Sequence, residues 1–332
     1  MLEHGGRLRR AAREYGRAVE HWVDLSTGIS PWGWPVPVIP ARAWQRLPED
    51  DDDLIEAARD YYCAPHVWPV AGSQAAIQHL PRLRGRSRVG VISPGYGEHA
   101  HAWRAAGHAV VSLPARALLE RVAEFDVVVL IHPNNPGGER FEHRALLACH
   151  ASLAARGGWL IVDEAFMDAS PQESLCPQSA REGLIVLRSV GKFFGLAGAR
   201  AGFVCASVGL LGALREAVGP WALSGPTRYV VQRALEDRAW QARARTWLSE
   251  HSARLAALLT RHGLTPSAGC AFFQWCCDER AAVLHRALAM QGVLTRLFDT
   301  PRSLRFGLPA DEVAWHRLDG ALASLAIREA VS

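Results

Sequence analysis

The chain has 332 residues, of which 49% are hydrophobic, and this length and composition predict a globular protein with two domains. Its formal net charge of +4 is small, and Lys and Arg are scattered along the sequence, so nucleic acid is not an expected partner. The chain starts without an apolar leader segment and no later stretch approaches the ~20 apolar residues of a membrane span, so we expect a cytoplasmic protein that does not enter a membrane.

The first forty residues are rich in Trp and Pro, and we predict that residues 1–40 form an extended arm outside the central sheet. The acidic run Glu49 to Asp53 directly precedes the helical sequence LIEAARDYY. We interpret the run as acidic capping of the start of a helix, because the helix dipole favours negative charge there. The run lacks the spaced ligands of a metal site, and no metal is expected.

A phosphate-binding turn is the next candidate feature. The sequence AGSQA at residues 71–75 opens a helical run. Backbone N–H groups at the start of a helix bind anions, and the Ser73 hydroxyl could add a further donor. Gly72, Ser73 and Gln74 are therefore candidate phosphate ligands.

Six apolar runs alternate with Ala- and Leu-rich helical segments in the middle of the chain. The runs are RVGVIS, AVVSLP, DVVVLI, WLIVDE, LIVLRS and AGFVCA, and helices are expected over 96–106, 142–155 and 210–217. This alternation is typical of an α/β domain with a mostly parallel central sheet and flanking helices. We predict that this larger domain covers residues 41–220.

From about Trp221 the sequence changes to long helical stretches, followed by the strand-like CAFFQWCC and a last helix. We predict a smaller α+β domain over residues 221–332. In its strand, the adjacent Cys276 and Cys277 should face opposite sides. The seven cysteines are dispersed and include no C-x-x-C pair, so neither a disulfide framework nor a zinc site is expected.

Polar side chains follow three of the predicted strands. Asn135 lies in HPNNPGG after one run, Asp163 ends the next, and Ser189 and Lys192 follow a third. The intervals from Asn135 to Asp163 (163 − 135 = 28) and from Asp163 to Lys192 (192 − 163 = 29) each fit one βα unit. Singly, these residues would be explained by a turn, a helix cap and a solvated charge. Because ligands bind at the carboxyl ends of parallel strands, their order predicts one crevice lined by an amide, a carboxylate and a lysine.

The sequence resembles the fold type I, aspartate aminotransferase-like enzymes that use pyridoxal 5′-phosphate (PLP). The resemblance rests on NNPGG, on DEAF at 163–166, and on the pattern S-x-x-K-x-x-x-L-x-G-x-R-x-G from Ser189 to Gly202. It implies that Lys192 binds PLP covalently. It also implies that Asp163 keeps the pyridine nitrogen protonated, which lets the cofactor accept electrons.

The same resemblance implies roles for further residues. Tyr96 would stack on the cofactor ring and Asn135 would donate to its O3′ oxygen, while Phe166 stands where many relatives have a donating Tyr. The phosphate of PLP would be bound by Gly72, Ser73, Gln74, Ser189 and Arg200. Tyr62 resembles a tyrosine that reaches the phosphate of the neighbouring subunit, so a homodimer with shared active sites is expected.

The reaction depends on which groups hold the substrate. Arg305 in SLRFGL resembles the carboxylate-binding arginine of the family, and Arg296 in GVLTRLF matches the position that binds a substrate phosphate in histidinol-phosphate aminotransferases. The segments HGGRLRRAAREYG and VDLSTGISPWGWP resemble the start of the L-threonine-O-3-phosphate decarboxylases of cobalamin biosynthesis. In that family the His-Gly-Gly segment reaches across the dimer to the substrate phosphate, which implies such a role for His4 and Gly5.

The expected activity is therefore that of a lyase, the decarboxylation of L-threonine O-3-phosphate to (R)-1-amino-2-propanol O-2-phosphate. One alternative is a histidinol-phosphate-type or other class I/II aminotransferase, against which the N-terminal segment argues. A second alternative, from another class, is a non-catalytic regulator with the PLP fold. The complete set of cofactor residues and the lack of a preceding DNA-binding sequence argue against that alternative.

Overall fold

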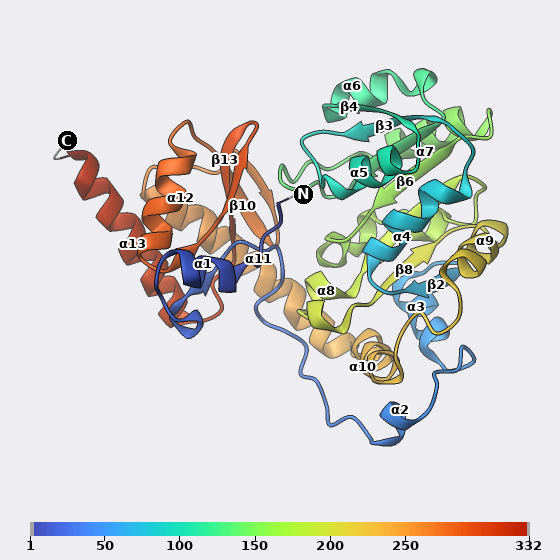
Figure 1. Cartoon of the computed structure of the whole chain (residues 1–332), viewed down its shortest axis with the longest axis horizontal. Helices are drawn as coiled ribbons and strands as arrows, with labels where there is room; N and C mark the ends of the chain where they lie inside the picture. The colour runs from blue at the N-terminus through green and yellow to red at the C-terminus, as the bar shows by residue number, and fades with distance from the viewer. Residues whose placement is uncertain (1–2, 331–332) are drawn as a thin grey trace. The chain divides into compact units, whose positions relative to one another are not determined.

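The computed structural model describes residues 3–330, which form two compact units (Figure 1). Unit 1 contains the described residues up to Trp32, the loop Pro136–Gly138 and the residues from Thr246 onward. Unit 2 contains Gly33–Asn135 and Glu139–Arg245.

This division differs from the predicted segments 1–40, 41–220 and 221–332. The N-terminal residues are not a separate arm, because the short strand β1 (Val23–Asp24) pairs in parallel with β11 (Val293–Leu294). At the other boundary, the change of sequence texture near Trp221 marks only the start of helix α10 (Gly225–Glu236), which still belongs to unit 2. The division falls inside the long helix α11 (Arg238–Arg261).

Unit 2 is built around a seven-stranded sheet of order β2-β8-β7-β6-β5-β3-β4. The pairs from β4 to β7 are parallel, and β8 and β2 add antiparallel strands at one side. This confirms the predicted mostly parallel sheet, and all six predicted strands are present. The strands are β2 (Val67–Val70), β3 (Arg88–Ile92), β4 (Ala109–Leu113), β5 (Val127–Ile131), β6 (Trp159–Asp163), β7 (Leu184–Ser189) and β8 (Gly202–Cys205).

Helices flank this sheet (Figure 1), and the strands β5, β7 and β8 are wholly buried, as expected for a sheet covered on both faces, whereas the edge strand β4 is partly exposed. The three helices predicted between the strands are present as α5, α7 and α9, within two residues of the expected bounds. The helices of unit 2 are α2 (Arg42–Gln45), α3 (Leu54–Tyr62), α4 (Ser73–His79), α5 (Glu98–Ala105), α6 (Ala115–Glu120), α7 (His143–Ala154), α8 (Val190–Phe193), α9 (Val208–Val218) and α10.

The acidic run before α3 has two roles. Asp52 accepts a hydrogen bond from the Leu54 backbone N–H, which supports the predicted capping of the helix start. Asp50 and Asp52 also form ion pairs with the buried Arg228 of α10, in which Asp52 accepts from the Arg228 Nε at 2.7 Å. The run therefore links α10 to the start of α3 as well as capping α3.

Unit 1 holds a four-stranded antiparallel sheet of order β12-β13-β10-β9. Its strands are β9 (Ala268–Cys270), β10 (Phe273–Cys277), β12 (Arg296–Asp299) and β13 (Arg302–Gly307). Its helices are α1 (Leu8–Glu14), the C-terminal part of α11, α12 (Ala281–Met290) and α13 (Glu312–Ala330). On β10, Cys276 is buried and Cys277 exposed, which confirms the predicted alternation, and all seven cysteines are free.

No helix within residues 3–330 is long and apolar enough to cross a membrane. In the same part of the chain, no group of three or more His, Cys, Asp or Glu side chains is arranged to hold a metal ion.

A buried ion cluster joins strand β7 to the loop after β6. Arg188 Nη1 donates to Glu164 Oε2 at 2.6 Å, and its Nη2 donates to Asp168 Oδ1 at 2.9 Å. The three side chains are at most 2% exposed. Glu164, the second residue of the DEAF motif, thus has a structural partner.

Replacing Arg188 should destabilise the protein strongly, because two carboxylates would remain buried without their cation. We expect Arg188→Met to lower the free energy of unfolding by about 3–5 kcal/mol, measured by urea denaturation. The control Arg116→Met removes an exposed ion pair with Glu120 and should leave the free energy of unfolding almost unchanged. A loss for Arg188→Met as small as that of the control would contradict the structural role of the cluster.

Candidate active site

A pocket in unit 2 lies at the carboxyl ends of β5, β6 and β7. It brings together all the residues predicted to bind the cofactor except Tyr62. The lining residues are Gly72, Ser73, Gln74, Tyr96, Ile131, Asn135, Asp163, Ala165, Phe166, Ser189, Lys192 and Arg200. The expected convergence of an amide, a carboxylate and a lysine on one crevice is therefore present in the structure.

Lys192 lies in the short helix α8, directly after β7, and its side chain is half-buried. Its ammonium nitrogen is 5.7 Å from the centre of the Phe166 ring. It is also the only lysine in the sequence. Any chemistry that needs a lysine side chain must therefore use this residue.

Asp163 is held in a fixed position at the end of β6. Its side chain is 5% exposed, its Oδ1 accepts from the Ala165 backbone N–H at 3.1 Å, and its Oδ2 is 2.8 Å from the His99 Nε2. His99 is buried in α5 and was not predicted as a site residue. A possible sequence signal was its position three residues after Tyr96 in SPGYGEH, which could place both rings on one side of the helix start.

The turn before α4 is shaped for a close approach to Arg200. Gly72 has a φ of +73°, and a Cβ at this position would lie 2.9 Å from the Arg200 Nη2. At Gly202 a Cβ would lie 2.5 Å from the Ser73 backbone nitrogen. Both glycines therefore let the backbone of the turn pack against the guanidinium and strand β8. Backbone N–H groups beside an arginine form a suitable cradle for a phosphate.

Tyr96 and Gln74 are joined on one side of the pocket. The Tyr96 hydroxyl donates to Gln74 Oε1 at 3.2 Å, and Gln74 Nε2 donates to Glu98 Oε2 at 3.0 Å. Burial raises the pKa of Tyr96 to about 12, so its hydroxyl keeps its proton near neutral pH. The ring can therefore serve as a neutral aromatic wall.

Tyr62 does not lie in this pocket. It is only 5% exposed, its hydroxyl is inaccessible and has no hydrogen-bond partner among the described residues, and its ring packs against the Arg188 guanidinium at 4.6 Å. Burial raises its pKa well above the usual range. The prediction that Tyr62 reaches a neighbouring subunit is wrong, because its ring points into the core of its own unit.

The predicted substrate-binding arginines lie in unit 1, on neighbouring strands. Arg296 of β12 and Arg305 of β13 are directly opposite in the antiparallel register. Arg305 is buried, and burial together with Arg296 lowers its pKa to about 10, so it remains charged at neutral pH. Like charges directly opposite each other destabilise a sheet. Such a pair is therefore suited to binding anionic groups that offset the repulsion.

The N-terminal glycines are fastened beside these arginines. A Cβ on Gly5 would lie 2.1 Å from the Ser26 carbonyl oxygen, so only glycine fits there. Gly6 N–H donates to the Ser26 hydroxyl at 2.7 Å, and the Ser26 carbonyl accepts from Arg305 Nη2 at 2.9 Å. The HGG motif is thus part of the Arg305 environment in unit 1.

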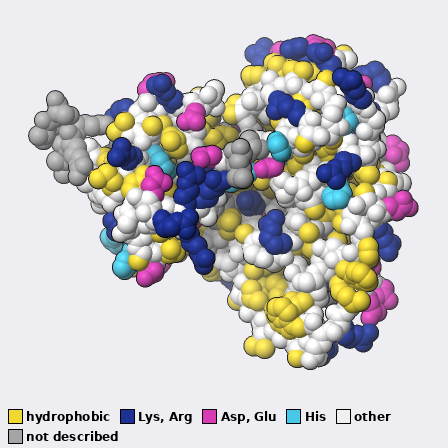
Figure 2. Space-filling model, viewed as in Figure 1, with side chains coloured by type: hydrophobic (Ala, Val, Ile, Leu, Met, Phe, Trp, Pro, Cys, Tyr) yellow, Lys and Arg dark blue, Asp and Glu magenta, His cyan; other side chains and the backbone are white. Residues whose placement is uncertain are grey.

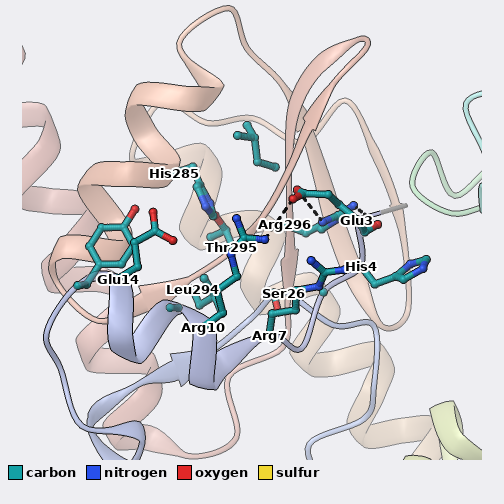
Figure 3. A pocket seen from close by; sticks show the side chains of 14 residues that line it. Glu3, His4, Arg7, Arg10, Glu14, Ser26, His285, Leu294, Thr295 and Arg296 are labelled. Carbon is teal, nitrogen blue, oxygen red and sulfur yellow. Dashed lines mark hydrogen bonds and ion pairs between the residues drawn. The ribbon is translucent and has the colours of Figure 1, made fainter. Parts of the chain in front are cut away.

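A second pocket, also in unit 1, contains His4, Gly5 and Arg296 together (Figure 3). The imidazole of His4 extends away from the Glu3 carboxylate in this view. The pocket also contains Glu3, Arg7, Arg10 and His285, none of which was predicted as a site residue.

Fold and strand-end pocket together define a member of the aminotransferase class. The family model for "Aminotransferase class I and II" matches residues 47–313, so the chain belongs to this family.

Sequence identity to curated relatives shows which group within the family the chain is most similar to. The curated "Threonine-phosphate decarboxylase" of Pseudomonas aeruginosa is 58% identical over 322 residues, covering 97% of this chain and 97% of the relative. The chain therefore groups with the threonine-phosphate decarboxylases.

Solved structures agree on the fold. A histidinol-phosphate aminotransferase from Sinorhizobium meliloti in complex with pyridoxal-5′-phosphate has a TM-score of 0.84 at 20% identity, covering 98% of this chain and 96% of that chain. The L-threonine-O-3-phosphate decarboxylase from Porphyromonas gingivalis has a TM-score of 0.78 at 17% identity, covering 91% and 98%. Because the two folds match similarly well, fold alone does not separate decarboxylase from aminotransferase.

Proposed function

We propose that this protein decarboxylates L-threonine O-3-phosphate to (R)-1-amino-2-propanol O-2-phosphate with PLP as its cofactor. The 58% identity to a threonine-phosphate decarboxylase over 97% of both chains carries this proposal. The paired arginines in unit 1 and the strand-end pocket in unit 2 supply residues of the required chemical types.

The residues of the strand-end pocket fit PLP. Lys192 offers the only lysine amine, Asp163 a fixed buried carboxylate for the ring nitrogen, and Asn135 an amide for O3′. The Gly72 turn, Ser189 and Arg200 would bind the phosphate, and the Tyr96 ring would cover one face. When bound, PLP supplies an electron sink for the electrons released by cleavage at the substrate Cα.

Substrate binding is assigned to unit 1. Arg305 would bind the α-carboxylate and Arg296 the phosphate, with His4 and Gly5 adding contacts to the phosphate. Two fixed anion sites orient the substrate so that the bond to the carboxylate is the one that breaks. After carbon dioxide has left, the Lys192 amine would return a proton to Cα, so the product keeps the amine and loses only the carboxylate.

The test is to incubate the PLP-loaded enzyme with L-threonine O-3-phosphate without any 2-oxo acid. Carbon dioxide release over many turnovers, with the phosphorylated amine identified by mass, supports the decarboxylase. A single turnover that stops until 2-oxoglutarate is added would instead show an aminotransferase, and the proposal would fail.

The reaction fits a cytoplasmic step of cobalamin biosynthesis, since its product is the side-arm unit of the corrin ring.

We also propose a homodimer. Unit 2 exposes apolar side chains on one stretch before α3, with Val38 at 92%, Trp44 at 68% and Leu47 at 66% exposed. Several large apolar side chains exposed close together in the sequence are typical of a segment that another protein surface covers.

Analytical ultracentrifugation should therefore give twice the chain mass of 36.3 kDa. Trp44→Glu should shift the protein toward the monomer, because a charge would be buried at the interface. The control Val313→Glu changes an exposed apolar residue of unit 1 and should leave the mass unchanged. A wild-type protein of monomeric mass would contradict the dimer.

A further inference from the structure

Glu3 places an acidic side chain inside the basic pocket of unit 1. Its Oε1 is 3.4 Å from the Arg10 Nη1, and its Oε2 is 4.0 Å from the Arg296 Nη1 (Figure 3). Its backbone carbonyl accepts a hydrogen bond from the Arg296 Nη2 at 2.6 Å. Figure 3 shows the carboxylate between the two guanidinium groups.

The two kinds of contact differ in strength. The short bond from Arg296 to the backbone carbonyl of Glu3 is a charge-assisted hydrogen bond, and it holds the chain in place. The carboxylate is 65% exposed, and it has only a long hydrogen bond from Arg10 Nη1 at 3.4 Å and an ion pair with Arg296 at 4.0 Å, so it is held weakly. A carboxylate held in this way can leave the pocket while the chain stays fastened.

Apart from Glu3, the charged side chains of the pocket are arginines and one further carboxylate, Glu14. Arg7 and Arg10 of the N-terminal segment line it together with Arg296, and Figure 2 shows Lys and Arg side chains gathered over α1. Of the two arginines that contact Glu3, Arg296 is more buried than Arg10. Burial and the charge of Arg7 lower the pKa of Arg296, and the charge of Glu3 raises it. Burial also lowers the pKa of His285, whose Nδ1 is 2.8 Å from the Thr295 hydroxyl. Arg7, Arg10 and Arg296 therefore supply the permanent positive charge of the pocket.

We propose that the Glu3 carboxylate, which contacts both Arg10 and Arg296, is an internal anion that the substrate phosphate displaces, and that Arg10 is a further phosphate-binding residue. The inference rests on the proposed function for the identity of the ligand. A phosphate monoester carries a charge of about −1.5 to −2 and three acceptor oxygens, whereas a carboxylate carries one charge and two oxygens. The phosphate can therefore replace Glu3 between Arg10 and Arg296. Ligands whose anionic group carries only one charge would displace it poorly, so Glu3 favours phosphorylated substrates.

The experiment measures binding of inorganic phosphate to the PLP-loaded enzyme by calorimetry at low salt, so that cofactor already fills its own phosphate site. Glu3→Gln should lower the Kd about three- to fivefold, because the competing charge is gone and the backbone contact to Arg296 remains. Arg10→Gln should raise the Kd about three- to tenfold. Both effects should shrink in high salt.

Matched controls come from the same segment. Glu20→Gln and Arg13→Gln make the same charge changes at exposed positions that do not line the pocket, and should change the Kd by less than about twofold. An unchanged phosphate affinity in Glu3→Gln would show that the carboxylate does not compete with phosphate, and a weaker affinity would show that it supports the structure of the pocket. Either result would overturn the proposal. An Arg10→Gln variant that behaves like Arg13→Gln would remove Arg10 from the site.

The KM for L-threonine O-3-phosphate should follow the phosphate Kd, falling in Glu3→Gln with little change in kcat. The two proposals can fail separately. Tighter phosphate binding without carbon dioxide release would retain the role of Glu3 and refute the decarboxylase. Normal decarboxylation with KM and Kd unchanged in Glu3→Gln would refute the role of Glu3 alone.

Discussion

Lys192→Ala should abolish turnover, with a loss of about 10³-fold or more, because no other side chain of the sequence carries a primary amine. The lysine is assigned two tasks, covalent attachment of the cofactor and return of a proton to the substrate Cα. Both need an amine that can lose its charge. The measurement is carbon dioxide release from L-threonine O-3-phosphate together with the visible absorbance of the bound cofactor, which should also be lost.

Lys192→Arg is the matched control. It keeps a positive charge beside Phe166 but removes the amine, so it should be as inactive as Lys192→Ala. If the arginine variant retained activity, the lysine would act only as a cation. Without cofactor, the thermal unfolding of both variants should stay close to that of the cofactor-free wild type, since the side chain is half-buried and lies at the pocket wall.

The single lysine also permits a direct chemical test. Borohydride reduction of the PLP-loaded enzyme should leave one cofactor attached to the peptide that contains Lys192, as read by mass spectrometry. The N-terminal amine is the other primary amine present. Cofactor found there, with the Lys192 peptide unmodified, would contradict the assignment.

The sheet and its strand-end residues could be predicted from the sequence because the signals are local. Each strand of the parallel sheet is a short apolar run, and each functional side chain follows its strand within a few residues. The spacing of about one βα unit then brings Asn135, Asp163 and Lys192 to one edge. For this part of the chain, the local patterns and the tertiary structure agree.

The features that were missed depend on contacts between distant residues. His99 meets Asp163 across 64 positions, and the N-terminal strand β1 meets β11 near the other end of the chain. The sequence around β1 and β11 carries no local sign of their pairing, and the only local sign of His99 is its spacing from Tyr96. Tyr62 was misassigned because its place in YYCAP does not show which way its ring points, and the ring is in fact packed on Arg188.

Asp163 should be the second most sensitive residue. Asp163→Asn should lower kcat about 10²- to 10³-fold while the cofactor remains bound, because an amide cannot stabilise a protonated ring nitrogen as a carboxylate does. Asparagine has the same shape, and its oxygen can still accept from the Ala165 N–H. Cofactor affinity and thermal stability should therefore change little, which separates loss of charge from loss of structure.

The companion variant Asp163→Ala opens space beside the ring and allows a test of the charge itself. A PLP analogue with a methyl group on the ring nitrogen carries a permanent positive charge that needs no carboxylate to maintain it. With this analogue Asp163→Ala should recover part of its kcat, about tenfold or more over the same variant with PLP. The wild type should lose activity with the analogue, because the methyl group would meet a carboxylate fixed by His99 and Ala165. If the analogue failed to improve Asp163→Ala, the carboxylate would serve to hold His99 in place, and the assignment of Asp163 to the ring nitrogen would be withdrawn.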